Sequence, residues 1–280
     1  MNLIKSEIEK PVNMENKLPA YTHENIELTT RLEQLRLEFL ELFTRHKDMV
    51  ENESAILTSL YLQKLGHLQL ELLQKQTEAA RLKMKMNLIQ AAINRDEQPN
   101  LHAIENLINK QMQDYYAQIE AQAAALNEAR EVLSHLIPEE EAAKLKEVFR
   151  VLCKKLHPDL NPNQTEEEKD LFVRVKSAYD LNQLGELQKI LLYFENSKKE
   201  KLPLVSVDEK RKQIRHLEEN IAGLKSKIEQ LKQSFPFTIE ELIFDEEYIL
   251  QRQEETKTQI KTSEDEIVKY QTIINIMTDE

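Results

Sequence analysis

The sequence predicts an all-α fold, with elongated coiled-coil or helical-hairpin arms and one inserted helical module. Only three of the 280 residues are glycine, and 31% are charged. Sandwiches, barrels and doubly wound sheets need many tight turns, which favour glycine because it adopts positive φ without steric cost. The isolated Gly66, Gly185 and Gly223 also cannot build a glycine-rich phosphate loop. Apolar residues instead recur about every 3.5 positions, which is the spacing of long amphipathic helices.

Prolines and this apolar period divide the chain into five predicted segments. They are a mobile tail (1–24), a long helical coiled-coil arm (25–98), a long helix leading into the module (99–137), the module itself (138–200) and a C-terminal antiparallel helical hairpin (205–280).

The first arm is predicted from apolar rows with a seven-residue spacing. One row contains Leu28, Leu35, Leu42 and Met49. The register slips near Asn52, where we expect a bend, and it resumes at Leu65. Rows that persist over several heptads with charged flanks favour a coiled coil, and ordinary amphipathic bundle faces are the alternative.

The two remaining arm segments are predicted from proline positions and the same period. Asn100 follows Pro99 and is the expected N-cap of the helix leading into the module. Near the C-terminus, heptad rows lie on both sides of Pro236. We therefore expect these two helices to pair as a hairpin that turns at residues 234–237.

Composition and charge exclude several classes of protein. Cys153 is the single cysteine, so the chain has neither a disulfide framework nor a cysteine-based zinc site, and we expect a packed thiol. The net charge of −12 argues against broad nucleic-acid binding. We expect no secretory signal, because residues 1–10 lack a long enough apolar run, and no run of about 18 apolar residues could cross a membrane. We expect a cytoplasmic protein that is not an enzyme and holds no metal or cofactor.

The module differs from the arms because its first helix carries a basic stripe. Lys146, Arg150 and Lys154 follow one another at four-residue intervals, and Lys155 lies on the opposite flank. Such like charges repel one another by a few tenths of a kcal/mol per pair, about 0.2–0.5. A basic stripe in an acidic chain therefore predicts an acidic partner.

Two apolar helix faces flank a short loop in the module. The first face contains Leu145, Val148, Phe149, Leu152 and Leu156, and the second contains Phe172, Val175, Ala178 and Tyr179. Between them lie His157, Pro158 and Asp159, followed by the capping-box pair Thr165 and Glu168. The pattern predicts two antiparallel helices with the loop at their tip.

This pattern resembles the core of a J-domain, the DnaJ-type co-chaperone module. A basic amphipathic helix, a His-Pro-Asp loop and a helix with a Phe…Ala-Tyr signature follow in the family's order over residues 126–195. The resemblance implies an all-α module that binds an ATP-loaded DnaK-type (seventy-kilodalton heat-shock) chaperone and accelerates its ATP hydrolysis.

The resemblance also implies roles for individual residues. Lys146, Arg150, Lys154 and Lys155 would dock on the acidic surface of the chaperone. Asp159 would accept a charge-assisted hydrogen bond from the partner. Pro158 would stiffen the loop so that His157 and Asp159 keep their orientation.

Departures from the family pattern leave a second function open. Ala129 and Arg130 replace the family's paired tyrosines, and Ser134 replaces a glycine. Residues 187–194 carry only Lys189 where the family has a basic last helix. The alternative is a structural coiled-coil scaffold or oligomerisation protein whose J-like segment has lost chaperone coupling. In either case the arms would bind a client or assembly, or mediate self-association.

Overall fold

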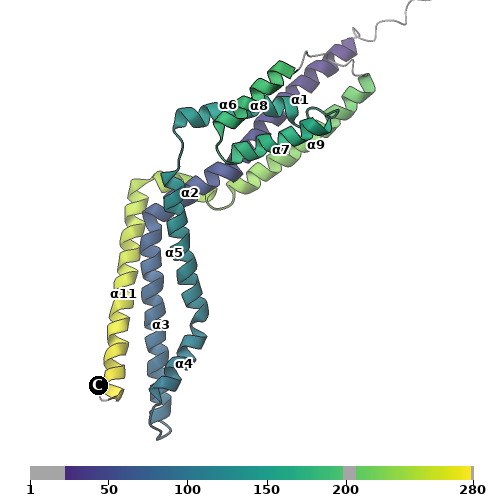
Figure 1. The fold of residues 1–280 in the computed structure, drawn as a ribbon. Helices are drawn as coiled ribbons and strands as arrows, with labels where there is room; N and C mark the ends of the chain where they lie inside the picture. The colour runs from purple at the N-terminus through teal and green to yellow at the C-terminus, as the bar shows by residue number, and fades with distance from the viewer. Residues whose placement is uncertain (1–22, 198–205, 279–280) are drawn as a thin grey trace, which may run out of the picture. The chain divides into compact units, whose positions relative to one another are not determined.

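The computed structural model describes residues 23–197 and 206–278, and every regular element in these ranges is a helix (Figure 1). The predicted all-α class is therefore confirmed. The predicted tail lies outside the described residues up to residue 22, and the first helix begins at His23. Residues 198–205, where the predicted module meets the predicted hairpin, also lie outside them.

The chain divides into two compact units, each built from separate parts of the sequence. The first contains Met1–His46 and Pro138–Ile228, and the second contains Lys47–Ile137 and Glu229–Glu280. The predicted arm at 25–98 is therefore shared between the two units. The heptad rows that predicted it run along both parts, so they give no signal of this division.

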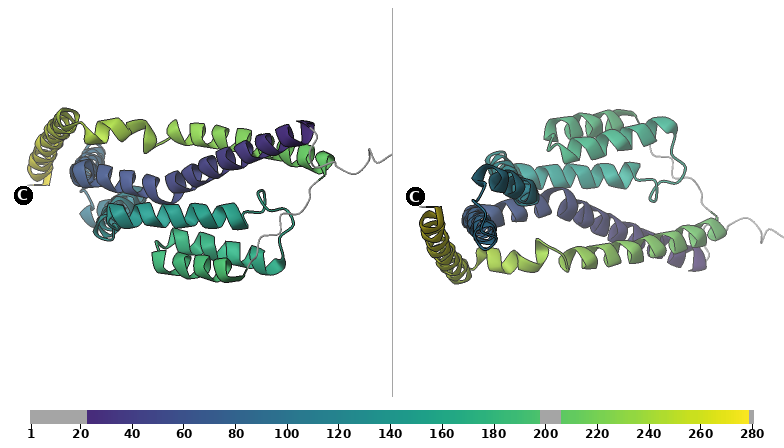
Figure 2. Two further views of the ribbon diagram at one scale, coloured as in Figure 1. Left: turned by 90° about the horizontal axis from the view of Figure 1, so that it is seen from above. Right: turned by 90° about the horizontal axis from the view of Figure 1, so that it is seen from below.

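The first unit contains five helices of the described chain. They are α1 (His23–Asp48), α6 (Glu139–Leu156), α7 (Glu166–Asp180), α8 (Leu184–Ser197) and α9 (Val207–Lys232), of which α1 and α9 run slightly past its boundary. Helices α6, α7 and α8 pack against one another in all three pairs, and Figure 2 shows them as neighbouring teal and green helices. These three helices are called the module below.

Helices α1 and α9 run in the same direction and are joined by ion pairs. Arg211 of α9 pairs with Glu24 of α1. One heptad further along both helices, Arg31 lies 2.9 Å from Glu218, and after another heptad Lys225 lies 2.7 Å from Glu38. Seven-residue steps on both helices are the interval expected of parallel helices with heptad repeats.

The second unit contains the remaining helical elements of the described chain. They are the π-helix Met49–Glu53, α2 (Ser54–Tyr61), the π-helix Leu62–Gly66, α3 (His67–Ile93), α4 (Leu101–Gln111), α5 (Gln113–Ser134), the 3₁₀-helix Phe237–Ile239, α10 (Glu240–Phe244) and α11 (Glu246–Thr278). The register slip predicted near Asn52 coincides with the first π-helix, because a π-turn inserts an extra residue into the α-helical repeat.

Helix α3 is central to the second unit and packs against α11, α4 and α5 (Figure 1). Its Leu82 and Ile89 form a buried cluster with Tyr270 and Ile274 of α11. Lys75 lies 2.6 Å from Glu264, and the carbonyl of Lys64 accepts a hydrogen bond of 2.9 Å from Gln253. Because both contacts join residues 189 positions apart, α3 and α11 are also parallel.

These pairings correct the predicted C-terminal hairpin. The sequence predicts that the helices on either side of Pro236 pair with each other, whereas the structure gives each an N-terminal partner. Helix α9 pairs with α1, and α11 pairs with α3. Heptad rows predict that a helix needs a partner but do not identify that partner, so proximity in sequence was misleading.

The segment leading into the module is also partly corrected. Asn100 caps α4 as predicted, because its Oδ1 accepts a 3.0 Å hydrogen bond from the amide of Ala103. However, α5 packs on α2 and α3 in the second unit, although its last part was expected to form the first helix of the J-like module. Helix α5 also lies close to Gly66, where a Cβ atom would be only 2.6 Å from Cδ2 of Leu126. A glycine at this helical position avoids that close contact.

Candidate functional site

Helix α6 is favoured by charge at both of its ends. Glu139, Glu140 and Glu141 occupy its first turn, and Lys154 and Lys155 occupy its last turn. Carboxylates near the N-terminus and ammonium groups near the C-terminus both interact favourably with the helix dipole. The sequence therefore stabilises a helix that stops next to the His-Pro-Asp loop (residues 157–159).

The predicted core of the module is brought together almost completely. Phe149 and Tyr179 stack with their ring centroids 4.0 Å apart, and His157 lies against Phe172 at 5.0 Å. The contact of the later residue 157 is with the earlier residue 172, and the contact of 149 is with 179. The helices α6 and α7 are therefore antiparallel. The buried predicted residues are Leu145, Phe149, Leu152, Leu156, Phe172, Val175, Ala178 and Tyr179, whereas Val148 is half-buried.

The sequence reasoning missed part of this core. Leu160 from the loop and Leu187, Ile190 and Phe194 from α8 are also buried in the first unit. The single cysteine, Cys153, is buried as expected of a packed thiol. The only sequence signal for the four additional core residues was that they are apolar, because α8 carries no recognisable motif.

The loop after α6 is shaped by local hydrogen bonds. The residue before a proline is pushed out of the helical region, and His157 is accordingly extended, with φ −74° and ψ 131°. The amide of Asn161 donates to the carbonyl of His157 at 2.9 Å, and its side chain donates to the carbonyl of Lys154 at 3.1 Å. Thr165 and Glu168 form the predicted capping box, which fixes the start of α7.

Helix α7 ends at an asparagine and not at the nearby glycine. Gly185 lies inside α8. The terminating residue is Asn182, with φ 53°. Its amide donates to the carbonyl of Tyr179 at 3.0 Å, and the amide of Gln183 donates to Ala178 at 2.8 Å, which is a Schellman arrangement. Asparagine tolerates the left-handed region better than most residues, so it replaces glycine here.

His157 lies in an aromatic cage rather than in solvent. Its ring centroid lies 4.8 Å from that of Phe39 and 4.4 Å from that of Phe43, and both phenylalanines belong to α1. Phe172 of α7 contributes a third edge-to-face contact. The residue is only 8% exposed. Edge-to-face packing of this kind favours a well-defined ring orientation.

The cage keeps the imidazole of His157 neutral. Burial lowers its pKa to about 4, although the neighbouring carboxylate of Asp159 opposes this shift and Lys176 adds to it. The amide of Asp159 donates to Nδ1 of His157 at 3.2 Å, so this nitrogen acts as an acceptor. A neutral ring with its proton on Nε2 satisfies both observations.

Asp159 is held by two side chains from α9. Asn220 donates from Nδ2 to one carboxylate oxygen at 2.8 Å, and Nε2 of His216 lies 3.2 Å from the other. Neither His216 nor Asn220 was predicted from the sequence to belong to the site. The only sequence signal was their four-residue spacing on α9, which is common on any exposed helix face.

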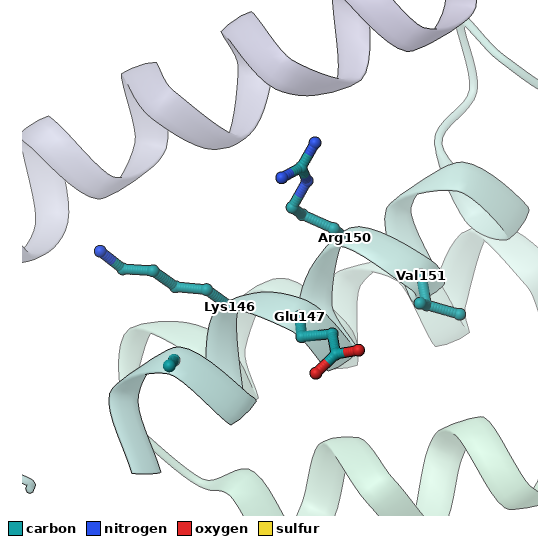
Figure 3. Close-up of a pocket in the computed structure, with 5 residues that line it drawn as sticks. Lys146, Glu147, Arg150 and Val151 are labelled. Atoms are coloured by element: carbon teal, nitrogen blue, oxygen red, sulfur yellow. The ribbon is translucent and has the colours of Figure 1, made fainter. Parts of the chain in front are cut away.

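The predicted basic stripe occupies one side of α6. Lys146 is half-buried, Arg150 and Lys154 are exposed, and Figure 3 shows the side chains of Lys146 and Arg150 extending toward the same side. They line a shallow pocket of about 390 Å³ together with Ala143, Glu147 and Val151. Lys155, by contrast, points its ammonium group at the ring of Phe194, 5.5 Å from the centroid. Its charge is therefore engaged within the module.

Two further properties concern the described residues as a whole. In residues 23–197 and 206–278, no group of three or more histidine, cysteine, aspartate or glutamate side chains is placed to hold a metal ion. None of the described helices combines the length and apolar character that crossing a membrane requires.

Comparisons of this chain with models of known protein families, with curated proteins and with solved structures find no match. The interpretation of the module therefore depends on its own residues and on the geometry of its loop.

Proposed function

We propose that this chain is a J-domain-type co-chaperone that docks on a DnaK-type chaperone and stimulates its ATPase. The observation that carries the proposal is the position of the His-Pro-Asp loop between the antiparallel helices α6 and α7, beside a basic stripe. Phe149 and Tyr179 stack at the centre of this pair. The loop, the two helices and their shared core are the features that support the proposal.

The mechanism that we propose is recognition rather than catalysis by this chain. Lys146, Arg150 and Lys154 steer the module toward an acidic surface, because opposite charges accelerate encounter and fix its register. Asp159 then accepts a charge-assisted hydrogen bond from a basic group of the chaperone. The parallel helix pairs of α1 with α9 and of α3 with α11 would bind the client or assembly, or a second copy of the chain.

The cytoplasm is the compartment that we propose for this activity. The lone Cys153 is buried and suits a reducing environment, since it has no second cysteine with which to form an intramolecular disulfide.

A second candidate function is favoured by one observation. His157 is enclosed by Phe39 and Phe43, and both oxygens of Asp159 are engaged by α9. A structural scaffold that has lost chaperone coupling would use the loop in this way, as a packing element between helices. The two candidates differ in whether the loop ever contacts a chaperone.

A single-turnover ATPase assay with a DnaK-type chaperone tests the proposal. At saturating concentration the wild-type chain is expected to accelerate ATP hydrolysis, and Asp159→Asn or His157→Gln is expected to abolish the effect. Asp170→Asn is the matched control, because it makes the same charge change at an exposed position of α7. If several such chaperones show no acceleration with the wild type or with the variants described in the next section, the scaffold function is favoured.

A further inference from the structure

We propose that helices α1 and α9 form an intramolecular mask over the His-Pro-Asp loop, and that chaperone docking requires displacement of this mask. The inference rests on the proposed function and adds a way in which chaperone docking would be regulated. All of its contacts lie within the first compact unit.

The first part of the mask covers His157. Phe39 and Phe43 lie one turn apart on α1 and place their rings 4.8 and 4.4 Å from the imidazole. Phe39 is itself only 2% exposed. A partner therefore cannot reach His157 while α1 stays in place, because aromatic side chains already fill the space around the ring.

The second part of the mask occupies Asp159. Asn220 binds one carboxylate oxygen at 2.8 Å, and His216 lies 3.2 Å from the other. A basic group of a chaperone would need these same two oxygens. Helix α9 of the same chain therefore already contacts the oxygens that a docked chaperone would need. The contacts from α9 and those from the chaperone would compete for Asp159.

The ion pairs that join α1 to α9 are individually weak. Arg31–Glu218 and Lys225–Glu38 join α1 to α9 with side chains that are about half exposed, and exposed ion pairs contribute little each. The side chain of His216 is 55% exposed. The module, in contrast, has its own core around Phe149 and Tyr179, so displacement of α1 and α9 leaves its three-helix packing in place.

The mask predicts a reduced apparent affinity for the chaperone. When only a fraction of molecules is competent to bind, the apparent dissociation constant rises by the reciprocal of that fraction. Removing two hydrogen bonds to a carboxylate is expected to raise the open fraction about tenfold. The concentration of this chain that gives half-maximal ATPase stimulation should fall by the same factor.

The test uses a variant that leaves the core untouched. His216→Ala combined with Asn220→Ala removes both contacts to Asp159, and Arg215→Ala combined with Glu219→Ala is the matched control on exposed positions of the same turns of α9. We expect the first pair to lower the half-maximal concentration about tenfold and the control to leave it unchanged. Amide hydrogen exchange at His157 and at residues 159–161, measured without chaperone, should accelerate in the His216→Ala/Asn220→Ala variant only.

The outcomes separate the mask from the proposed function. Equal half-maximal concentrations in wild type and first pair would overturn the mask and leave the co-chaperone function standing, whatever the exchange rates. A second outcome is accelerated exchange in the His216→Ala/Asn220→Ala variant while neither the wild type nor any variant stimulates the ATPase. This result would overturn the co-chaperone function, and the contacts of α1 and α9 with the loop would then be purely structural. Asp159→Asn in the background of the first pair must abolish stimulation if the exposed loop is what docks.

Discussion

The buried imidazole of His157 predicts a specific loss of stability in acid. In the folded chain its pKa is lowered to about 4 from an ordinary value of 6.5. The unfolded state therefore binds the proton more tightly, and folding stability is fully present above about pH 6.5 and is lost as the pH falls toward 4. A shift of this size corresponds to about 3 kcal/mol in total, and about 2 kcal/mol is already lost at about pH 5.

Urea denaturation measured by circular dichroism at about pH 7.5 and about pH 5 tests this magnitude. Other carboxylates and histidines also titrate in this range, so the matched comparison is His157→Gln, which cannot gain the proton. The free energy of unfolding of the wild type should fall by about 2 kcal/mol more than that of the variant. Equal losses in the two proteins would refute a neutral, enclosed His157.

Three further predictions concern contacts outside the loop. Glu38→Lys should weaken the α1–α9 pairing by about 0.5 kcal/mol, and adding Lys225→Glu should restore it, as read from hydrogen exchange in α9. Glu105 accepts hydrogen bonds at 2.8 Å from Arg81 and Lys85, which outweigh partial burial and lower its pKa. Glu105→Gln should therefore destabilise the second unit by about 1 kcal/mol at neutral pH, and this difference should shrink as acid protonates the wild-type carboxylate. Asn182→Ala should cost about 1 kcal/mol in thermal unfolding, whereas Asn182→Gly should cost little, because φ is 53° there.

Each of these predictions has an outcome that would contradict it. Lack of rescue by Lys225→Glu would mean that the first substitution acts through something other than the ion pair. An unchanged midpoint of thermal unfolding in Glu105→Gln would show that the two cations contribute nothing net. Equal stabilities of the alanine and glycine variants at 182 would remove the argument from backbone conformation.

The parts of the fold that the sequence predicts well are local. The period of about 3.6 residues places Phe149 and Tyr179 on facing sides of two helices, and the structure stacks them. Thr165 and Glu168 form their capping box within four residues of chain, so neighbouring sequence is enough to predict it. The end of α7 is harder to predict in this way, since Asn182, and not the nearby Gly185, adopts the left-handed conformation there.

The parts that the sequence does not predict are long-range. Heptad rows on α1, α3, α9 and α11 are chemically alike, so period alone cannot decide which helices pair. The ring of Phe43 meets His157 across more than a hundred residues, and Asn220 reaches Asp159 from 61 residues away. Neither contact leaves a local pattern, because a phenylalanine in a heptad row and an asparagine on a helix surface are both common.

The parallel pairing of distant helices has a consequence for the order in which the chain acquires its structure during synthesis. Arg31 and its partner Glu218 are separated by 187 positions, so α1 leaves the ribosome long before α9 exists. Residues 139–180, which contain α6, the loop and α7, are also complete before α9 is made. During translation the His-Pro-Asp loop therefore passes through an interval in which His216 and Asn220 are absent. Contacts of such large sequence separation close slowly, which lengthens that interval.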